Sequence, residues 1–149
     1  MLKIKLLLGK ELCDSVAEEL TASGHIITED ADFILTENRN YPDLIIGKRD
    51  GEIFRLKLAD ITHIESLGHN IIAHCGGREY KLSERLIRLQ NLLNPEDFLR
   101  ISNSVIVNVH CIQSIKPALS ARFILTLSDG CRVDVTRSYY YIFKDFFKI

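Results

Sequence analysis

A polar turn that leads directly into a β-branched strand is the feature that most constrains the fold of this chain. The turn comprises residues 100–104 (RISNS), and the strand comprises residues 105–108 (VIVN). About one hairpin later, two apolar runs flank the dipeptide Asp129-Gly130. An Asp-Gly pair in this setting is typical of a tight β-hairpin, because both residues tolerate the backbone angles of such turns. We therefore predict antiparallel β structure here.

Other short apolar runs extend this prediction over residues 59–149. Residues 61–64 and 71–75 are strand candidates, and Gly76-Gly77 leads from the second of these into a third at 78–82. Strands joined by tight turns in this way form antiparallel sheets. Most of this part of the chain is therefore predicted to be β.

One clear helix is expected among these strands, at residues 83–93. Ser83 is a good N-cap, and the leucines at positions 86, 89 and 93 recur with helical spacing before Asn94-Pro95 ends the segment. The aromatic segment 139–147 is predicted to close the chain as a short helix or turn that packs on the sheet.

The first 58 residues have a different pattern, in which one amphipathic helix is mixed with short strands. We therefore predict a small β-α-β-β extension at 1–58 in front of a mainly β domain at 59–149. The expected elements are strands at 2–8, 26–27 and 33–35, a helix at 10–23 closed by Gly24, and a hairpin around Asp50-Gly51.

Charge and composition bound the function less tightly. The net charge is −1, with 8 Lys and Arg against 11 Asp and Glu in residues 1–58, and 11 against 9 in residues 59–149. The basic composition that usually accompanies nucleic-acid binding is missing, so DNA binding would need its positive groups gathered on one face. The four cysteines have no metal-ligand spacing. No apolar run is long enough for a membrane span or signal peptide, and we expect a cytoplasmic protein.

Residues 98–108 read F-L-R-I-S-N-S-V-I-V-N, and the Asp129-Gly130 hairpin closes with V-T-R at 135–137. This arrangement resembles the LytTR family of bacterial DNA-binding domains, whose pattern is F-x-R-hydrophobic-x-x-S-x-hydrophobic-V-N followed by a D-G hairpin ending in V-[S/T]-R. The resemblance runs from about Ala59 to the C-terminus. It implies a mainly β fold of layered antiparallel sheets with one main helix, preceded here by the small α/β extension.

Three polar residues lie on turns or strand ends, where a scaffold usually displays functional groups. In the strand 131–135 the odd positions are apolar, so Arg137 falls on apolar parity and must project beyond the strand end. Its guanidinium suits bidentate contact with guanine, Asn103 suits adenine, and His69 can reach a base edge through either ring nitrogen.

The LytTR resemblance implies that these three residues read bases from loops rather than from a recognition helix. His69 could equally be a solvated loop residue, and Asn103 could merely cap its own turn. Arg100 is as well explained by a structural role, and Asn108 by pairing with buried backbone. The resemblance implies phosphate contacts for Asn70, Ser104, Arg122 and Ser138.

Two dipeptides, His74-Cys75 and His110-Cys111, invite a metal or thiol–imidazole site. Adjacent strand residues point to opposite faces, so neither dipeptide can present both side chains to one ion. We therefore predict no metal and no cofactor, while pairs formed across strands stay open. Nothing marks an oxyanion hole or an orienting group, so we also predict no small-molecule substrate and no enzymatic activity. The aromatic run 139–141 is expected to serve core packing rather than base stacking.

The sequence thus predicts a stand-alone transcription regulator that lacks a receiver domain, since fewer than sixty residues precede the LytTR-like part. It would bind double-stranded DNA through major-groove contacts from loops. Because each good base contact gives only about 1–3 kcal/mol of discrimination, we expect a homodimer on repeated half-sites. The alternative is a protein-interaction module with weak DNA binding, in which the acidic first part binds a regulatory partner. The resemblance allows this partner to be a membrane protein.

Overall fold

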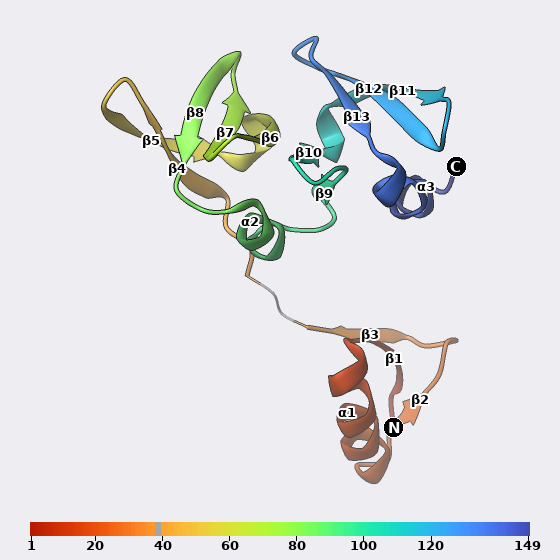
Figure 1. Ribbon diagram of the computed structural model, residues 1–149. Helices are drawn as coiled ribbons and strands as arrows, with labels where there is room; N and C mark the ends of the chain where they lie inside the picture. Colours follow the sequence, from red (N-terminus) through yellow and green to blue (C-terminus); the bar gives the residue numbers. More distant parts are fainter. Residues whose placement is uncertain (38–39) are drawn as a thin grey trace. The chain divides into compact units, whose positions relative to one another are not determined.

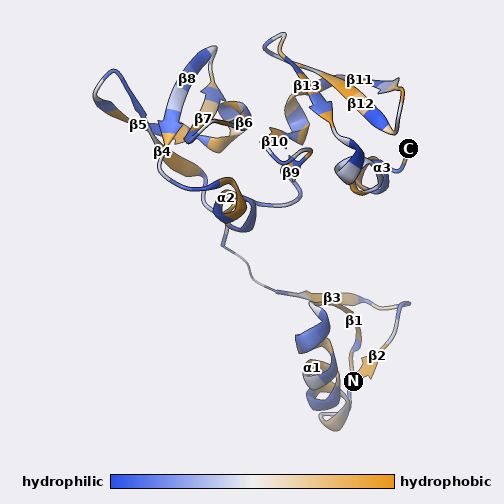
Figure 2. Cartoon of the chain, viewed as in Figure 1, coloured by the Kyte–Doolittle hydropathy of each residue, from blue (hydrophilic) through white to orange (hydrophobic). Residues whose placement is uncertain are grey.

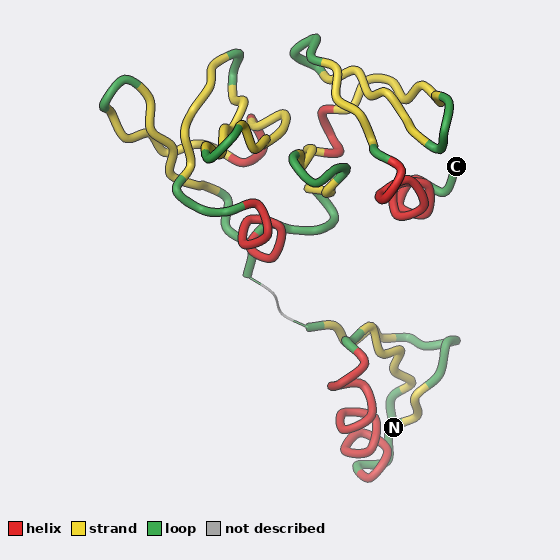
Figure 3. Tube along the Cα trace, viewed as in Figure 1, coloured by secondary structure: helices red, strands yellow, loops and turns green. Residues whose placement is uncertain are grey.

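The computed structural model describes residues 1–37 and 40–149, which form two compact units, Met1–Asn40 and Tyr41–Ile149 (Figure 1). Strands predominate in the larger unit, with short helices between and after them (Figure 3). Within the described ranges, no helix has the length and apolar character needed to cross a bilayer.

The smaller unit is a β-α-β arrangement with a three-stranded parallel sheet, in the order β2-β1-β3. Of its described residues, Ile4 alone is buried, with 7% of its surface exposed. The unit therefore has little core of its own. Its elements are β1 (Lys3–Leu7), α1 (Lys10–Ala22), β2 (Ile26–Ile27) and β3 (Phe33–Thr36).

The larger unit contains a seven-stranded antiparallel sheet in the order β5-β4-β8-β7-β6-β10-β9. A short helix, α2 (Leu86–Leu92), lies in the connection from β8 to β9 and packs its leucines on the sheet. The strands are β4 (Leu44–Arg49), β5 (Glu52–Lys57), β6 (Ile61–Leu67), β7 (Asn70–Cys75), β8 (Arg78–Leu82), β9 (Phe98–Arg100) and β10 (Val105–Asn108).

A second sheet of this unit has three antiparallel strands in the order β11-β12-β13 and is covered by the C-terminal helix. Its elements are β11 (Ile112–Ala118), β12 (Arg122–Leu127), β13 (Arg132–Val135) and α3 (Tyr140–Phe147). Single 3-10 turns connect the strands at η1 (Leu58–Asp60) and η2 (Val109–Cys111), and η3 (Arg137–Tyr139) leads from β13 into α3. The prediction of a mainly β protein with antiparallel sheets is confirmed.

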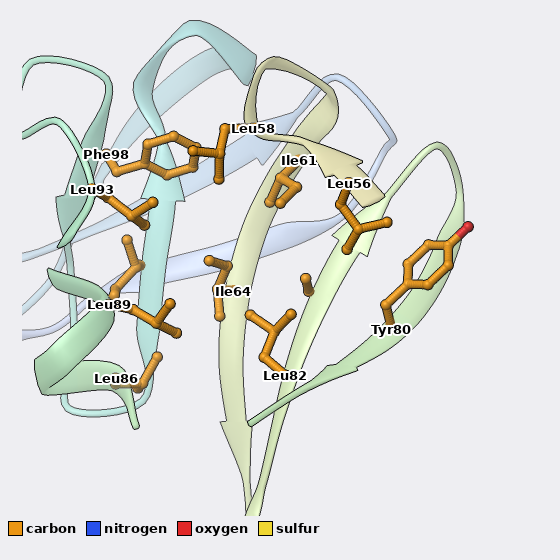
Figure 4. Close-up of a cluster of buried hydrophobic side chains, with 12 residues drawn as sticks. Leu56, Leu58, Ile61, Ile64, Tyr80, Leu82, Leu86, Leu89, Leu93 and Phe98 are labelled. Carbon is orange, nitrogen blue, oxygen red and sulfur yellow. The ribbon is translucent and has the colours of Figure 1, made fainter. Parts of the chain in front are cut away.

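The larger unit has two hydrophobic cores, the first around α2 and the second around α3. In the first, Leu86, Leu89 and Leu93 point from α2 towards Ile64 of β6 and Phe98 (Figure 4). In the second, Phe143 of α3 is fully buried against the apolar strand β12, which contrasts with the hydrophilic β8 (Figure 2). Strand β10 contributes to both cores, since Ile106 lies in the first and Val107 in the second.

The boundary between the units differs from the predicted one at residue 58. The hairpin β4–β5 belongs to the larger unit, because Lys48 pairs with Lys81 of β8 and the side chains of Leu56 and Leu58 lie in the first core. The Asp50-Gly51 turn forms as expected, with φ of 49° and 77°. Turn chemistry identifies a hairpin but does not say which sheet the hairpin joins.

The expected N-cap of α2 is wrong. The helix begins at Leu86, and its N-cap position is Arg85, whose side chain makes no capping hydrogen bond. Ser83 lies in a bend after β8 instead, because Leu82 and Leu86 are both buried and the chain must turn between them. The predicted leucine face at positions 86, 89 and 93 is confirmed.

Asn108 is buried, with 2% of its surface exposed, and satisfies backbone groups from two segments. Its Nδ2 donates to the carbonyl of Ile61 at 2.9 Å, and its Oδ1 accepts from the backbone N–H of His110 at 3.0 Å. The structural interpretation of Asn108 is therefore confirmed.

We predict that Asn108→Ala lowers the free energy of unfolding by about 1–3 kcal/mol, because it leaves a buried carbonyl and an N–H unpaired. Urea denaturation of both proteins measures the difference. Asn91→Ala, on the exposed face of α2, is the matched control and should change stability by no more than about 0.5 kcal/mol. Equal stabilities for the Asn108 variant and the parent protein would contradict this role.

Candidate nucleic-acid interface

An open hollow of about 580 Å³ lies where the β9–β10 turn meets the end of β13 and the start of η3. We call it the loop hollow. Most of its lining residues have polar side chains, and they come from three segments of the larger unit. It is lined by Glu65, Ser102, Asn103, Ser104, Val105, Arg132, Val133, Asp134, Thr136, Arg137 and Ser138.

Backbone hydrogen bonds hold the β9–β10 turn in place. Ile101 is fully buried and closes the turn by donating its N–H to Val105, and its carbonyl accepts from the N–H of Thr136 at 3.0 Å. On the other side, Ser66 of β6 donates its N–H to the carbonyl of Ser104 at 2.8 Å. The turn is therefore fixed to both sheets.

Arg100 reinforces this turn from within. Its Nε donates to the carbonyl of Ser102 at 3.0 Å, and its Nη2 donates to the carbonyl of Asn103 at 2.6 Å. Its Nη1 donates to Gln90 of α2 at 3.2 Å. These contacts assign Arg100 a structural role that positions the turn.

Asn103 is exposed at the tip of the turn. Its Oδ1 accepts a long hydrogen bond of 3.4 Å from the hydroxyl of Tyr139. Such a bond is weak, and the amide remains at the surface with a donor and an acceptor to offer.

Arg137 lies in η3, beyond the end of β13, and is exposed. Val133 and Val135 face the core while Arg132 and Asp134 face solvent, as the alternation predicted. Among the described residues, no hydrogen bond or ion pair holds the Arg137 side chain. Its planar fork of donors is free to meet a bidentate acceptor.

His69 occupies the exposed turn between β6 and β7, and Asn70 begins β7. Neither residue lines the loop hollow. Their turn follows Ser66, the residue bonded to Ser104, so it emerges at the same end of the sheet as the β9–β10 turn. The structure thus brings Asn103, Ser104, Arg137 and Ser138 into one hollow and leaves the β6–β7 turn beside it.

Arg122 is engaged in an ion pair, since its Nη2 lies 2.6 Å from Oδ2 of Asp134. Both side chains are about half exposed, at 46% and 47%. Asp134 lines the loop hollow, whereas Arg122 does not. Exposed pairs of this kind contribute little to stability.

The electrostatics of the hollow are nearly balanced. Arg132 and Arg137 face Glu65 and Asp134 around its lining. Residues 41–149 carry 15 Lys and Arg against 12 Asp and Glu, a net charge of +3, whereas residues 1–40 carry 4 against 8, a net charge of −4. Arg132 and Glu65 were not predicted as site residues, although the alternation in β13 already placed Arg132 on the polar face.

A polar cluster lies next to the hollow, across strands β6 and β7. The rings of His63 and His74 stack with centroids 4.0 Å apart, and Nε2 of His74 lies 2.6 Å from Oε1 of Glu65. His63 is 3% exposed. Burial, followed by the neighbouring His74, lowers the pKa of His63 to about 4, although Glu65 and Asp129 act in the opposite direction.

The two histidine–cysteine dipeptides have split environments, but only His74-Cys75 lies in a strand as predicted; His110-Cys111 lies in the 3-10 turn η2. The side chain of Cys75 packs against the first core while His74 stacks on His63. His110 pairs with Asp97 at 2.8 Å, whereas Sγ of Cys111 lies 3.8 Å from the carbonyl of Ile61. Neither dipeptide presents two ligands to one point.

Two of the three tyrosines at 139–141 pack against the second core. Tyr140 stacks on Phe123 with ring centroids 4.8 Å apart, and Tyr139 packs against the second core. Tyr141 differs, because 71% of its surface is exposed. Two of the three rings therefore serve the core.

The fold and the loop hollow together define a class of protein, a layered antiparallel β domain that presents polar side chains on loops. Residues 51–148 match the family model described as the LytTr DNA-binding domain. The chain belongs to the LytTR family. This membership supports DNA-binding transcription regulation, and the family is one of DNA-binding domains rather than enzymes.

Bacterial regulatory proteins and a solved DNA-binding domain are among the proteins similar to this chain. The transcriptional regulatory protein LytR of Staphylococcus aureus is 30% identical over 105 residues, which cover 70% of this chain and 43% of that protein. The sensory transduction protein LytT of Bacillus subtilis is 32% identical over 60 residues, covering 40% and 25%. The LytTr DNA-binding domain of a methyl-accepting/DNA response regulator from Bacillus cereus superposes with a TM-score of 0.70 at 22% identity, covering 72% of this chain and 99% of that one.

An HTH-type transcriptional regulator of Staphylococcus aureus is 34% identical over 71 residues, which cover 48% of this chain and 48% of that protein. The chain thus spans less than half the length of these curated relatives. The structural likeness establishes the fold of the larger unit. The LytTR membership predicted from the sequence is confirmed.

The low pKa of His63 predicts that stability falls as the pH is lowered from about 6.5 towards 4. In this window the unfolded chain binds a proton that the folded chain does not, so protonation favours unfolding. The shift from 6.5 to about 4 corresponds to a loss of about 3 kcal/mol at most.

Urea denaturation between pH 7 and pH 4.5, with metal ions removed by a chelator, measures this dependence. His63→Gln should flatten the slope, whereas His69→Gln, which removes an exposed imidazole from a turn, should keep it. Identical slopes for the parent protein and His63→Gln would show that His63 is not the group responsible.

Proposed function

We propose that the larger unit reads the sequence of double-stranded DNA with loops that enter the major groove, and that it regulates transcription in this way from the cytoplasm. The convergence of the 102–104 turn and the 136–138 segment on one hollow carries this proposal. In it, Asn103 and Arg137 contact base edges from the loop hollow, and His69 contacts a neighbouring step from the β6–β7 turn.

The chemistry of these side chains suits base edges. Arg137 has no ionic partner among the described residues, and its two terminal N–H groups match O6 and N7 of guanine. Asn103 offers one donor and one acceptor, the complement of N7 and N6 of adenine. Displacing the long bond from Tyr139 costs little, because it is 3.4 Å long.

Phosphate contacts complete the proposal. We assign them to Asn70, Ser104, Arg122 and Ser138, which are all exposed. Arg122 must then share its donors between Asp134 and the phosphate. Because one domain makes few base contacts, we further propose that two copies bind repeated half-sites as a homodimer on DNA.

Mobility-shift or polarization measurements with a fragment of the chain's own promoter region, and with a scrambled fragment of equal length, test the function. Affinity for the promoter fragment should exceed that for the scrambled one and should fall steeply with salt, because phosphate binding releases counterions. Equal affinity for both fragments would refute sequence reading.

A second candidate, a protein-interaction role, is favoured by the smaller unit. It is acidic, and its edge strand β3 exposes Phe33 and Ile34 to 54% and 63%. Under this alternative the unit holds a regulatory protein and DNA binding is weak. The salt series separates the two, since a protein partnership need not weaken in the same way.

We predict that Arg137→Ala lowers the preference for the promoter fragment by about 1–3 kcal/mol, the value of one bidentate base contact. The fold should be intact, because the side chain holds no partner in the described structure. Arg88→Ala removes an equal charge from α2, where Arg88 pairs with Glu84, and should leave the preference unchanged. Full preference in the Arg137 variant at matched salt would refute its role.

We also predict that residues 41–149 alone fold and bind DNA at least as tightly per domain as the whole chain, since the net charge changes from −1 to +3. Thermal melting and the same polarization assay measure this. A fragment beginning at residue 59 provides the contrast: it lacks Leu56, Leu58 and the strand that pairs with β8, so it should melt at a lower temperature. If 41–149 folds but does not bind, the smaller unit takes part in the interface.

A further inference from the structure

We propose that His63, Glu65 and His74 form a binding site for a divalent transition-metal ion of the zinc class. One donor atom from each residue lies within 4.8 Å of the donors of the other two. His63 is buried, while His74 and Glu65 are 14% and 24% exposed at the side chain. The cluster is therefore held by the protein on one side and reachable from solvent on the other.

Strand pairing brings these donors together. His63 and His74 are directly opposite each other in the antiparallel β6–β7 pair, and their rings are nearly parallel, at 7°. Glu65 lies two residues after His63 and therefore on the same face of the strand. Side chains opposite one another across two strands are close enough to share one ion. Because each nitrogen bonds an ion in the plane of its own ring, the His74 ring must rotate out of the stack when the ion binds.

A hydrogen-bonded chain prepares His63 as a ligand. Oγ1 of Thr62 donates to Oδ2 of Asp129 at 3.1 Å and also lies 2.9 Å from Nδ1 of His63. Because the hydroxyl has one hydrogen and the carboxylate accepts it, Nδ1 of His63 is the donor to Thr62. Nε2 then carries the lone pair that a metal requires, and the outer partners fix the ring.

Donor chemistry selects the ion. Two imidazole nitrogens and one carboxylate oxygen suit zinc and its neighbours rather than Mg²⁺ or Ca²⁺, which prefer oxygen ligands. Bonds of about 2.0–2.1 Å in a tetrahedral site place donors about 3.3 Å apart. Nε2 of His74 and Oε1 of Glu65, now 2.6 Å apart, would separate slightly as the ion enters between them.

Binding is balanced in protons and charge. The metal-bound ring of His74 is neutral with its hydrogen on Nδ1, so a hydrogen on Nε2 moves to Nδ1 by exchange with solvent, and the unprotonated Nε2 of His63 loses none. Glu65 binds as a carboxylate, and water takes the fourth position. The prediction of no metal rested on neighbours along one strand and left pairs across strands open; His63 and His74 are such a pair.

The test uses the whole chain, free of affinity tags and stripped with a chelator. Zn²⁺ affinity is measured by competition with a chromophoric chelator, and Co²⁺ absorption reports the ligand geometry. We expect one ion per chain, tetrahedral Co²⁺ bands and a raised melting temperature on loading. His74→Gln and Glu65→Gln should each weaken Zn²⁺ binding at least tenfold, and Thr62→Val about tenfold through loss of the outer bond.

Two matched variants make the result specific. His110→Gln removes a histidine that pairs with Asp97 elsewhere, and Cys13→Ser removes a thiol from α1 of the smaller unit; both should bind Zn²⁺ like the parent protein. The melting temperature of each stripped variant shows whether it is folded. Absence of a one-to-one complex in the parent protein overturns the proposal, as does weakened binding in either control with full binding in His74→Gln.

Discussion

Two backbone hydrogen bonds join the β9–β10 turn to both sheets of the larger unit, and the candidate interface depends on them. Ser66 holds the turn to the seven-stranded sheet at 2.8 Å, and Thr136 holds it to the end of β13 at 3.0 Å. Ile101, whose carbonyl accepts the bond from Thr136, is fully buried in the second core. Because the turn is bonded at both ends, Asn103 and Arg137 keep a fixed spacing, and a fixed spacing is what a base-reading surface requires.

The elements could be predicted from local chemistry, because each signal acts over a few residues. Asp50-Gly51 and Asp129-Gly130 form hairpin turns, and parity in β13 placed Arg137 beyond the strand end. The assignment of these elements to particular sheets could not be predicted, because it depends on pairing between residues far apart in the sequence. The β4–β5 hairpin joins β8 through Lys48 and Lys81, and nothing within the hairpin itself indicates that partner.

The same distinction holds for the site. Asn103 and Arg137 could be selected as polar residues near strand ends, and Ser104 and Ser138 only through the resemblance to the LytTR family; the four share one hollow. The acidic residue Glu65 enters the lining only because β6 pairs with β10 opposite Val105. The balanced charge of the hollow follows from this contact, so attraction to phosphate must come from the wider surface of the unit. Under the proposed function, the hollow therefore supplies selectivity more than affinity.

Side-chain hydrogen bonds of Thr62 provide a second connection between the two sheets, in addition to those backbone bonds. Thr62, at a bulge in β6, connects Asp129 of the β12–β13 turn to His63, so it also joins the two sheets. Burying polar groups costs free energy unless each is paired, and here every step is paired. Glu65 belongs to this cluster through His74 and to the loop hollow through its position on β6. The side chain of Glu65 is therefore shared by the histidine cluster and by the surface proposed to read DNA.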